Sequence, residues 1–270
     1  MKVSDFSPSY RQEVVVSREP LPSLVKSATR VLQIFDFFDE IQRDAKVHEI
    51  AERLDFPQSS TSVLLKSLVK LGFMDYDPRA RTFLPSPRIA LLGNWSGSGP
   101  IRDGSIIRMM EELAARTGEA IVLATRNGPY AQDVRVIQGR GQDPLPLPQG
   151  QRRLAVWSGA GVVLLKDEPD SLVQALCRRA NAEASEGETV DYRRVTAHLD
   201  LLRRTGYFFS RGLVTPGVGS LAMPLPEDLD RRGRSFAITV SGRVHDMEDR
   251  EQELVSIMRQ TIAKYLSPIA

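Results

Sequence analysis

The chain has 270 residues, of which 41% are hydrophobic and 26% charged, so it is neither wholly disordered nor fibrous. This length suits one large domain or two modest ones with a substantial buried core. Its 36 Lys and Arg residues face 34 Asp and Glu residues, which gives a formal net charge of +2. The chain is therefore no polycation, and any nucleic-acid contact must come from local clustering of positive charge.

Cysteine content and hydropathy exclude further classes of protein. Cys177 is the single cysteine, which excludes an intrachain disulfide and a multi-cysteine metal site and fits a reducing compartment. No window holds 18 uncharged apolar residues, and the N-terminus lacks the apolar core of a signal peptide. We therefore expect a cytoplasmic protein with no membrane contact.

The first part of the chain has helical periodicity. Prolines interrupt its beginning, so we expect a flexible arm over residues 1–20. Apolar residues at helical spacing predict a helix over about residues 25–39 and a second over residues 47–54. The sequence Asp-Phe-Pro at residues 55–57 predicts a tight connection, with Asp55 in a left-handed conformation, before a third helix.

The third helix is expected to present a small, polar face to solvent. Its expected buried positions are Thr61, Leu64, Leu65 and Leu68, and its outward positions are Gln58, Ser59, Ser60, Ser62, Val63 and Lys66. Two short strands are predicted over residues 73–76 and 82–84, joined by a type I turn at residues 77–80.

This order of elements, with a charged hairpin last, predicts a winged helix-turn-helix domain over residues 21–88. Between residues 58 and 88 the acids are Asp75 and Asp77, against five basic residues, so the third helix and hairpin form the electropositive side. For any one residue, helix capping or simple solvation is an equally good interpretation. The complete arrangement favours binding to double-stranded DNA.

The expected DNA contacts divide by chemistry. Backbone amides at the start of the third helix, with the hydroxyls of Ser59 and Ser60, would hold phosphate oxygens. Gln58, Ser62 and Lys66 would read base edges. Arg79 and Arg81 on the hairpin would reach the neighbouring backbone or the minor groove.

A segment rich in small residues separates this domain from the rest, and we place a linker at residues 89–105 and a second domain at residues 106–270. Patterning there predicts helices over residues 106–116, 171–182, 192–205 and 247–266 and strands over residues 120–125, 134–138, 207–210, 219–224 and 236–241. Residues 154–165 fit a strand or a helix. Without a regular βαβ repeat, the expected fold class is α+β.

Two sets of motifs resemble the IclR family of transcriptional regulators. They are Ser23–Leu32, Glu49–Thr61 and Leu68–Phe73 in the first domain, and Glu112–Glu119, Gly206-Tyr207, Pro216–Leu225 and Ala237–Gly242 in the second. Many regulators share a helix-turn-helix signature, so the second set, in the right order and at the right distance, makes the resemblance specific. It covers roughly residues 22–266.

The resemblance implies a homodimer or homotetramer whose GAF-like C-terminal domain binds a small-molecule effector. The positions that match the family's pocket are Trp157, Ser158, Ser210, Arg211, Ser220, Thr239 and Ser241. The chain departs from the family at residues 154–161 and at Arg211, where an acidic residue is usual. Because a guanidinium pairs with a carboxylate, Arg211 would favour an anionic ligand, and we expect a carboxylated or aromatic metabolite. In the alternative, Arg211 is solvated and Trp157 fills the pocket.

No catalytic constellation is recognisable. The three histidines, His48, His198 and His245, are far apart and form no metal-ligand pair. The glycines at residues 159–161 and 217–219 lack the dinucleotide-binding pattern. We expect no enzymatic activity, no cofactor and no metal. The alternative function is a metabolite-binding domain or enzyme whose N-terminal helices serve only dimerisation, and a test of specific DNA binding separates the two.

Overall fold

The structure is a computed structural model that describes residues 25–92, 99–141, 145, 147, 150–183, 189–229 and 233–266. The predicted arm at residues 1–20 and residues 93–98 of the predicted linker lie outside the described residues. The chain forms two compact units that divide between Gly97 and Ser98. No helix in the described ranges is long and apolar enough to cross a membrane.

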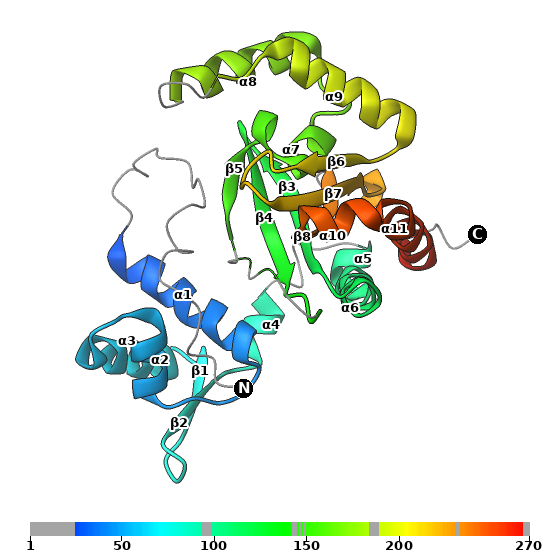
Figure 1. The fold of residues 1–270 in the computed structure, drawn as a ribbon. Coiled ribbons are helices and arrows are strands. Elements are labelled where there is room, and N and C mark those ends of the chain that lie inside the picture. The colour runs from blue at the N-terminus through cyan, green and yellow to red at the C-terminus, as the bar shows by residue number, and fades with distance from the viewer. Residues whose placement is uncertain are drawn as a thin grey trace. The chain divides into compact units, whose positions relative to one another are not determined.

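The N-terminal unit is a helix-turn-helix followed by a small β-hairpin, as the sequence predicted (Figure 1). Its elements are α1 (Lys26–Ile41), α2 (Val47–Leu54), α3 (Gln58–Lys70), β1 (Met74–Asp77), β2 (Thr82–Pro85) and α4 (Arg88–Leu92). β1 and β2 pair antiparallel and form the wing.

One hydrophobic core holds these elements together. Ile34, Ile50 and Leu65, from α1, α2 and α3, are each 0% exposed and belong to the same buried cluster. Phe83 joins this cluster from β2, and its backbone exchanges two hydrogen bonds with Ala45 ahead of α2. The core therefore fixes α3 against α1, α2 and the wing.

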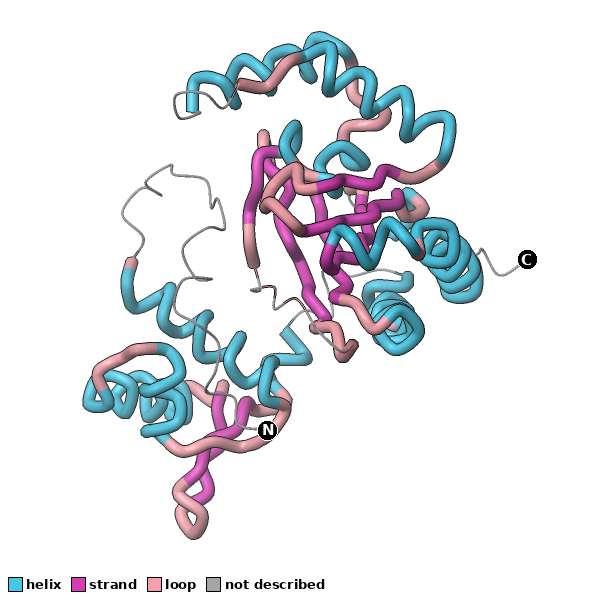
Figure 2. The backbone as a smooth tube through the Cα atoms, in the orientation of Figure 1, coloured by secondary structure: helices cyan, strands magenta, loops and turns pink. Residues whose placement is uncertain are grey.

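The C-terminal unit is a mixed α/β domain. Its helices are α5 (Gly99–Arg102), α6 (Ser105–Thr117), α7 (Gly159–Leu164), α8 (Asp170–Glu183), α9 (Tyr192–Thr205), α10 (Val244–Asp249) and α11 (Glu251–Leu266). Its strands are β3 (Ala120–Asn127), β4 (Tyr130–Ile137), β5 (Arg152–Leu154), β6 (Phe208–Arg211), β7 (Val218–Pro224) and β8 (Phe236–Arg243). They form an antiparallel sheet in the order β5-β4-β3-β8-β7-β6, with helices on both sides (Figure 2).

Strand alternation gives the sheet two different faces. One face carries Leu123, Leu221 and Ile238 into an apolar cluster with α6 and α11. The opposite face carries Ser220 and Thr239, and α7 packs against β7 and β8 there with α9 beyond it. The small polar side chains of β7 and β8 therefore lie on the α7 face.

The structure resolves residues 154–165, which the sequence left open. The end of β5 is followed by a short 3-10 turn at Ala155–Trp157 and then by α7. Gly161 allows this tight packing, because a Cβ atom there would lie 2.0 Å from the carbonyl oxygen of Ala155. The segment is thus mostly helical, with glycine at the point where helix and preceding turn touch.

The expectation of one continuous final helix is wrong. The chain forms α10 and α11 instead, with a break at Arg250. The Arg250 guanidinium donates to the carbonyl oxygen of Thr117 at the end of α6 and pairs with Glu119 at 3.5 Å. This contact joins residues far apart in sequence, so helical periodicity could not reveal it.

Candidate functional site

The turn between α2 and α3 sets the direction of α3. Asp55 has a φ of 54° and so adopts the predicted left-handed conformation. The backbone amide of Phe56 donates to the carbonyl oxygen of Ala51 at 2.9 Å, which closes the end of α2. Thr61, 0% exposed, donates its hydroxyl to the carbonyl oxygen of Pro57 and anchors the first turn of α3.

The start of α3 presents backbone amides and hydroxyls. No side chain caps the helix at Pro57, so its first N–H groups remain available to an external acceptor. Ser59 is exposed, whereas Ser60 is half-buried and donates its hydroxyl to the carbonyl oxygen of Pro57 at 2.9 Å. Because a serine has one hydroxyl proton, Ser60 would have to break this bond to donate to a phosphate.

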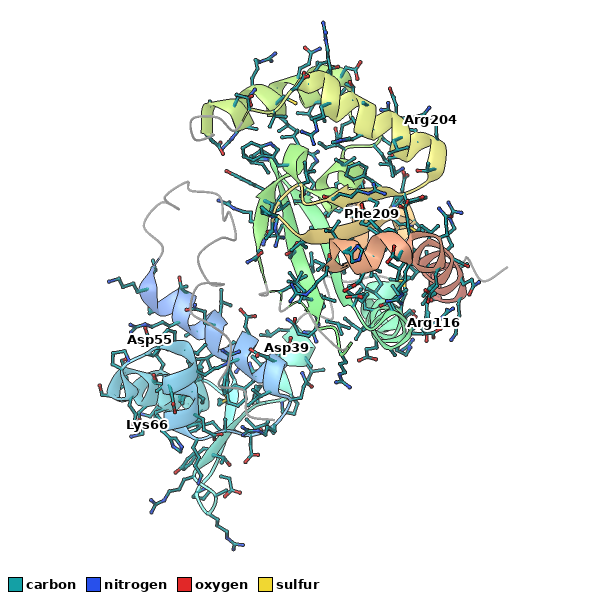
Figure 3. The ribbon with its side chains drawn as sticks, in the orientation of Figure 1. Asp39, Asp55, Lys66, Arg116, Arg204 and Phe209 are labelled. Carbon is teal, nitrogen blue, oxygen red and sulfur yellow. The ribbon has the colours of Figure 1, made fainter. Side chains whose placement is uncertain are left out.

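The predicted base-reading residues are unequally exposed. Gln58 and Lys66 are exposed, and Lys66 lies on α3 with its side chain at the surface (Figure 3). Ser62 is half-buried, although the sequence analysis placed it on the outward face. Apart from the exposed Val63, the outer surface of α3 is therefore polar and basic, with Ser62 at its flank.

The end of α3 is tied to the segment that follows β2. Gly72 has a φ of 76°, and its carbonyl oxygen accepts the hydroxyl of Ser86 at 2.7 Å. The guanidinium of Arg88 donates to the carbonyl oxygen of Leu71 at 2.7 Å and covers the ring of Phe73. Arg88, one of the five basic residues between residues 58 and 88, thus joins the segment after the wing to the end of α3.

The tip of the wing carries two exposed arginines. The Asp77 carboxylate accepts the backbone amides of Arg79 at 2.7 Å and Ala80 at 3.2 Å, and so orders the turn. Arg79 and Arg81 are exposed, and Arg81 has a φ of 56°. The acidic residue at the tip therefore shapes the loop from which the two cations project.

A cavity of about 90 Å³ lies on the α7 face of the C-terminal sheet. Its non-polar lining comes from Val122, Ala131, Leu145, Leu147, Gly159, Ala160, Val214 and Val218. Its polar lining comes from Asp133, Gln151, Arg153, Ser158, Ser210, Thr215, Ser220, Thr239 and Ser241. Five of the seven residues predicted for the effector pocket are thus brought together around one space.

Most of these five residues are held by hydrogen bonds. The Ser220 and Ser241 hydroxyl oxygens are 3.0 Å apart, and Thr239 lies 3.4 Å from Ser241. The Ser158 hydroxyl accepts the backbone amide of Gly161 and caps α7. Ser210 lies on the same face, on β6 opposite Ser220.

A charged pair that was not predicted from the sequence also lines this cavity. Arg153 on β5 lies 2.8 Å from the carboxylate of Asp133 on β4, and their side chains are 18% and 5% exposed. A second guanidinium nitrogen of Arg153 donates to Gln151. Burial raises the pKa of the Asp133 carboxyl, and the neighbouring guanidinium opposes that rise. One cation and one anion thus meet beside the hydroxyl groups.

Two predicted pocket residues lie elsewhere. Trp157 packs, half-buried, against an apolar cluster to which α7, α8 and α9 contribute, and does not line the cavity. Arg211 is exposed, and its guanidinium pairs with Glu248 at 2.9 Å and Glu251 at 2.7 Å. The expectation that Arg211 meets an anionic ligand in this cavity is therefore not supported, because successive strand residues face opposite sides and only Ser210 turns inward.

The described residues can also be compared with the requirements of a metal site and of a reactive thiol. They contain no group of three or more His, Cys, Asp or Glu side chains placed to hold a metal ion. Cys177 is buried, as expected, and burial raises the pKa of its thiol.

Family models match both units. The IclR helix-turn-helix domain matches residues 27–78, and the C-terminal domain of bacterial IclR transcriptional regulators matches residues 104–267. The HTH-type regulator XynR of Escherichia coli is 25% identical over 83% of this chain and 90% of its own length. The HTH-type repressor AllR of Klebsiella pneumoniae is 26% identical over 82% of both chains.

Solved structures have the same fold. IclR of Thermotoga maritima has a TM-score of 0.58 and 18% identity, over 89% of this chain and 98% of that one. An IclR regulator of Alicyclobacillus acidocaldarius has a TM-score of 0.56 and 20% identity, over 89% of this chain and 97% of that one.

Proposed function

Because the chain belongs to the IclR family of bacterial DNA-binding transcriptional regulators, we propose that it recognises a specific operator through α3 and the wing, and that a small metabolite in the C-terminal cavity modulates this binding. Members of this family are regulators and not enzymes. Membership therefore sets aside the alternative in which the N-terminal helices serve only dimerisation.

The observation that carries the DNA-binding proposal is the outer surface of α3 beside the wing. Gln58, Ser59 and Lys66 are exposed there, and Arg79 and Arg81 project from the neighbouring hairpin. A helix of this kind fits the major groove, and arginines on a wing reach adjacent phosphates or the minor groove. α3 and the wing are fixed to one buried core, so they can contact DNA as one rigid unit.

We further propose that the chain binds DNA as a homodimer or homotetramer in the cytoplasm. One helix-turn-helix module buries less surface than specific operators usually require, so paired half-sites are expected. A ligand could then act by changing the distance between two DNA-binding domains through the linker.

The proposed effector is a small carboxylate. The volume of the cavity supports its small size, and the charge of Arg153 supports its carboxylate group. A cavity that binds benzene has about 150 Å³, so a space of about 90 Å³ suits a ligand of few carbon atoms better than an aromatic one. Arg153 lines the cavity and would supply the cation that was expected from Arg211. Ser220, Thr239 and Ser241 would orient the rest of the ligand by hydrogen bonds.

Selection of genomic fragments by the full-length protein, followed by sequencing, tests the DNA-binding proposal. We expect enrichment of a shared motif with two half-sites, including fragments next to the protein's own gene. Random recovery at low salt, with the protein folded, would contradict the proposal.

Thermal unfolding in the presence of carboxylic acids of two to five carbon atoms tests the effector proposal. A ligand that binds only the folded state raises the melting temperature with its concentration. We expect at least one such acid to do so, and we expect the effect to persist in Arg211→Ala, because Arg211 lies outside the cavity. A series without any shift would contradict a small carboxylate effector.

A further inference from the structure

The outward face of α3 contains one aliphatic side chain that no predicted DNA contact uses. Successive residues of an α-helix are about 100° apart. Opposite the buried positions Thr61, Leu65 and Leu68, this spacing places a row made of Ser59, Val63, Lys66 and Lys70. Val63 is 64% exposed, whereas its neighbour Ser62 is half-buried. Val63 thus occupies the centre of the face on which Ser62 was expected.

An exposed valine alone means little, because aliphatic side chains are common on protein surfaces. The residues around Val63 indicate what this face binds. The other three members of the row are a serine and two lysines, and valine is no better than average at stabilising a helix. Lysines on both following turns would repel a second copy of this face, but they would attract phosphate groups. The charge of the row therefore favours DNA over self-association as its partner.

The position and shape of the Val63 side chain suit contact with the edge of a base pair. Residues in the N-terminal half of a recognition helix contact base edges in the major groove, and Val63 is in the second turn of α3. The apolar group that base pairs present there is the C5 methyl group of thymine. The branched side chain of valine strongly prefers one χ1 rotamer in a helix, so it would meet a methyl group with little loss of conformational freedom.

We propose that Val63 contacts the C5 methyl group of a thymine in the operator and so determines specificity at that base pair. This inference rests on the proposed operator binding through α3. Lys66 and Ser59, one turn away on either side, would hold the neighbouring base or phosphate and keep Val63 in register.

Single thymine-to-deoxyuridine replacements in the selected operator test the inference, because each removes one methyl group and leaves base pairing intact. With the full-length protein, we expect one thymine per half-site at which the replacement weakens binding about three- to fivefold, the effect of one methyl group. In Val63→Ala the same replacement should have no effect. In Leu71→Ala, an exposed apolar position at the end of α3, the replacement should weaken binding as it does in the wild type.

Two results would overturn the inference. One is specific operator binding that no deoxyuridine replacement weakens, and the other is a methyl effect of equal size in Val63→Ala. A protein that selects no operator at all would instead contradict the proposed function on which the inference rests. Circular dichroism of Val63→Ala confirms that any change arises at the interface and not from unfolding.

Discussion

Arg153 and Asp133 form an ion pair of 2.8 Å at the edge of the C-terminal cavity, with side chains that are 18% and 5% exposed. The more buried partner is the acid, and burial raises the pKa of the Asp133 carboxyl. Burial therefore favours the neutral form of Asp133, and the guanidinium of Arg153 opposes this effect. A ligand carboxylate that approaches Arg153 would compete with Asp133 for the same donor.

The pair predicts unequal effects on stability. Arg153→Met leaves a buried carboxylate without its cation and should lower the free energy of unfolding by about 3 to 5 kcal/mol. Asp133→Asn keeps an acceptor for the guanidinium, so its loss should be about 1 to 2 kcal/mol. Urea denaturation of both variants at pH 7 measures the difference. An equal loss in both would show that the buried acid does not depend on Arg153.

The same pair predicts a pH dependence. With Arg153 removed, burial raises the folded pKa of Asp133 further above its unfolded value, so the folded state binds a proton first. Its contribution to stability is then present at low pH and is lost as pH rises through the folded pKa. The deficit of Arg153→Met relative to the wild type should therefore be smaller at pH 4.5 than at pH 7. A constant deficit would contradict an ionised Asp133.

Two neighbouring glycines should respond differently to a methyl group. A Cβ atom at Gly161 would lie 2.0 Å from the carbonyl oxygen of Ala155, so Gly161→Ala should destabilise the unit by about 3 kcal/mol or more. At Gly159 the nearest atoms would be Ser210 Cβ at 3.3 Å and the Ser220 carbonyl oxygen at 3.4 Å. Gly159→Ala should therefore cost less, below about 1.5 kcal/mol. Thermal unfolding of both variants orders them, and the reverse order would contradict the packing of α7.

His198 predicts acid sensitivity. Its ring packs against Phe208 at a tilt of 43°, with centroids 4.7 Å apart, and its Nδ1 atom is buried without a hydrogen-bond partner among the described residues. Burial lowers the pKa of His198, and Arg194 lowers it further. Protonation therefore favours the unfolded state, whose histidine titrates near pH 6.5, and stability is lost as pH falls through that value toward the folded pKa.

The measurement is the free energy of unfolding at pH 7.5 and pH 5.5 in matched histidine variants. In His198→Gln the loss of stability over this range should be smaller than in the wild type. His48→Gln, at an exposed position, should lose as much as the wild type. Identical slopes in the wild type and His198→Gln would show that His198 is free to protonate in the fold.

The recognition helix and the wing should contribute different kinds of DNA contact. Lys66→Ala should weaken operator binding and relax the preference at one base pair, by about 1 to 3 kcal/mol of discrimination. Arg81→Asn, which keeps a residue that tolerates the left-handed backbone, should weaken binding to all sequences alike. Arg204→Ala, on α9, is the control. Binding selections with randomised operators separate the two patterns, and exchanged patterns would reverse the assignments.

Local patterns predicted much of the fold. In the N-terminal unit, helical periodicity and the sequence at residues 55–57 predicted α1, α2, α3 and the turn between the last two. In the C-terminal unit, α9 begins and ends where the sequence indicated. These elements depend on contacts within a few residues, which a single sequence contains.

The candidate site was predicted only in part. Ser210, Ser220, Thr239 and Ser241 face one cavity because strand alternation places them there. The same alternation puts Arg211 on the other face, a signal that the sequence analysis did not use. Asp133 and Arg153 are 20 residues apart on neighbouring strands, and no local pattern links such a pair. Val63 was placed on the outward face without being given a role, since its central position depends on the direction of the core.

The central claim is that α3 and the wing bind a specific operator, and the salt dependence of that binding tests it most directly. Fluorescence anisotropy with the selected operator and a scrambled duplex gives both affinities from low to physiological salt. We expect the logarithm of the operator affinity to fall linearly with that of the salt concentration, by about 0.9 for each phosphate contacted. We also expect a smaller slope in Arg79→Ala and a lasting preference for the operator. Equal affinity for both duplexes at every salt concentration would contradict the claim.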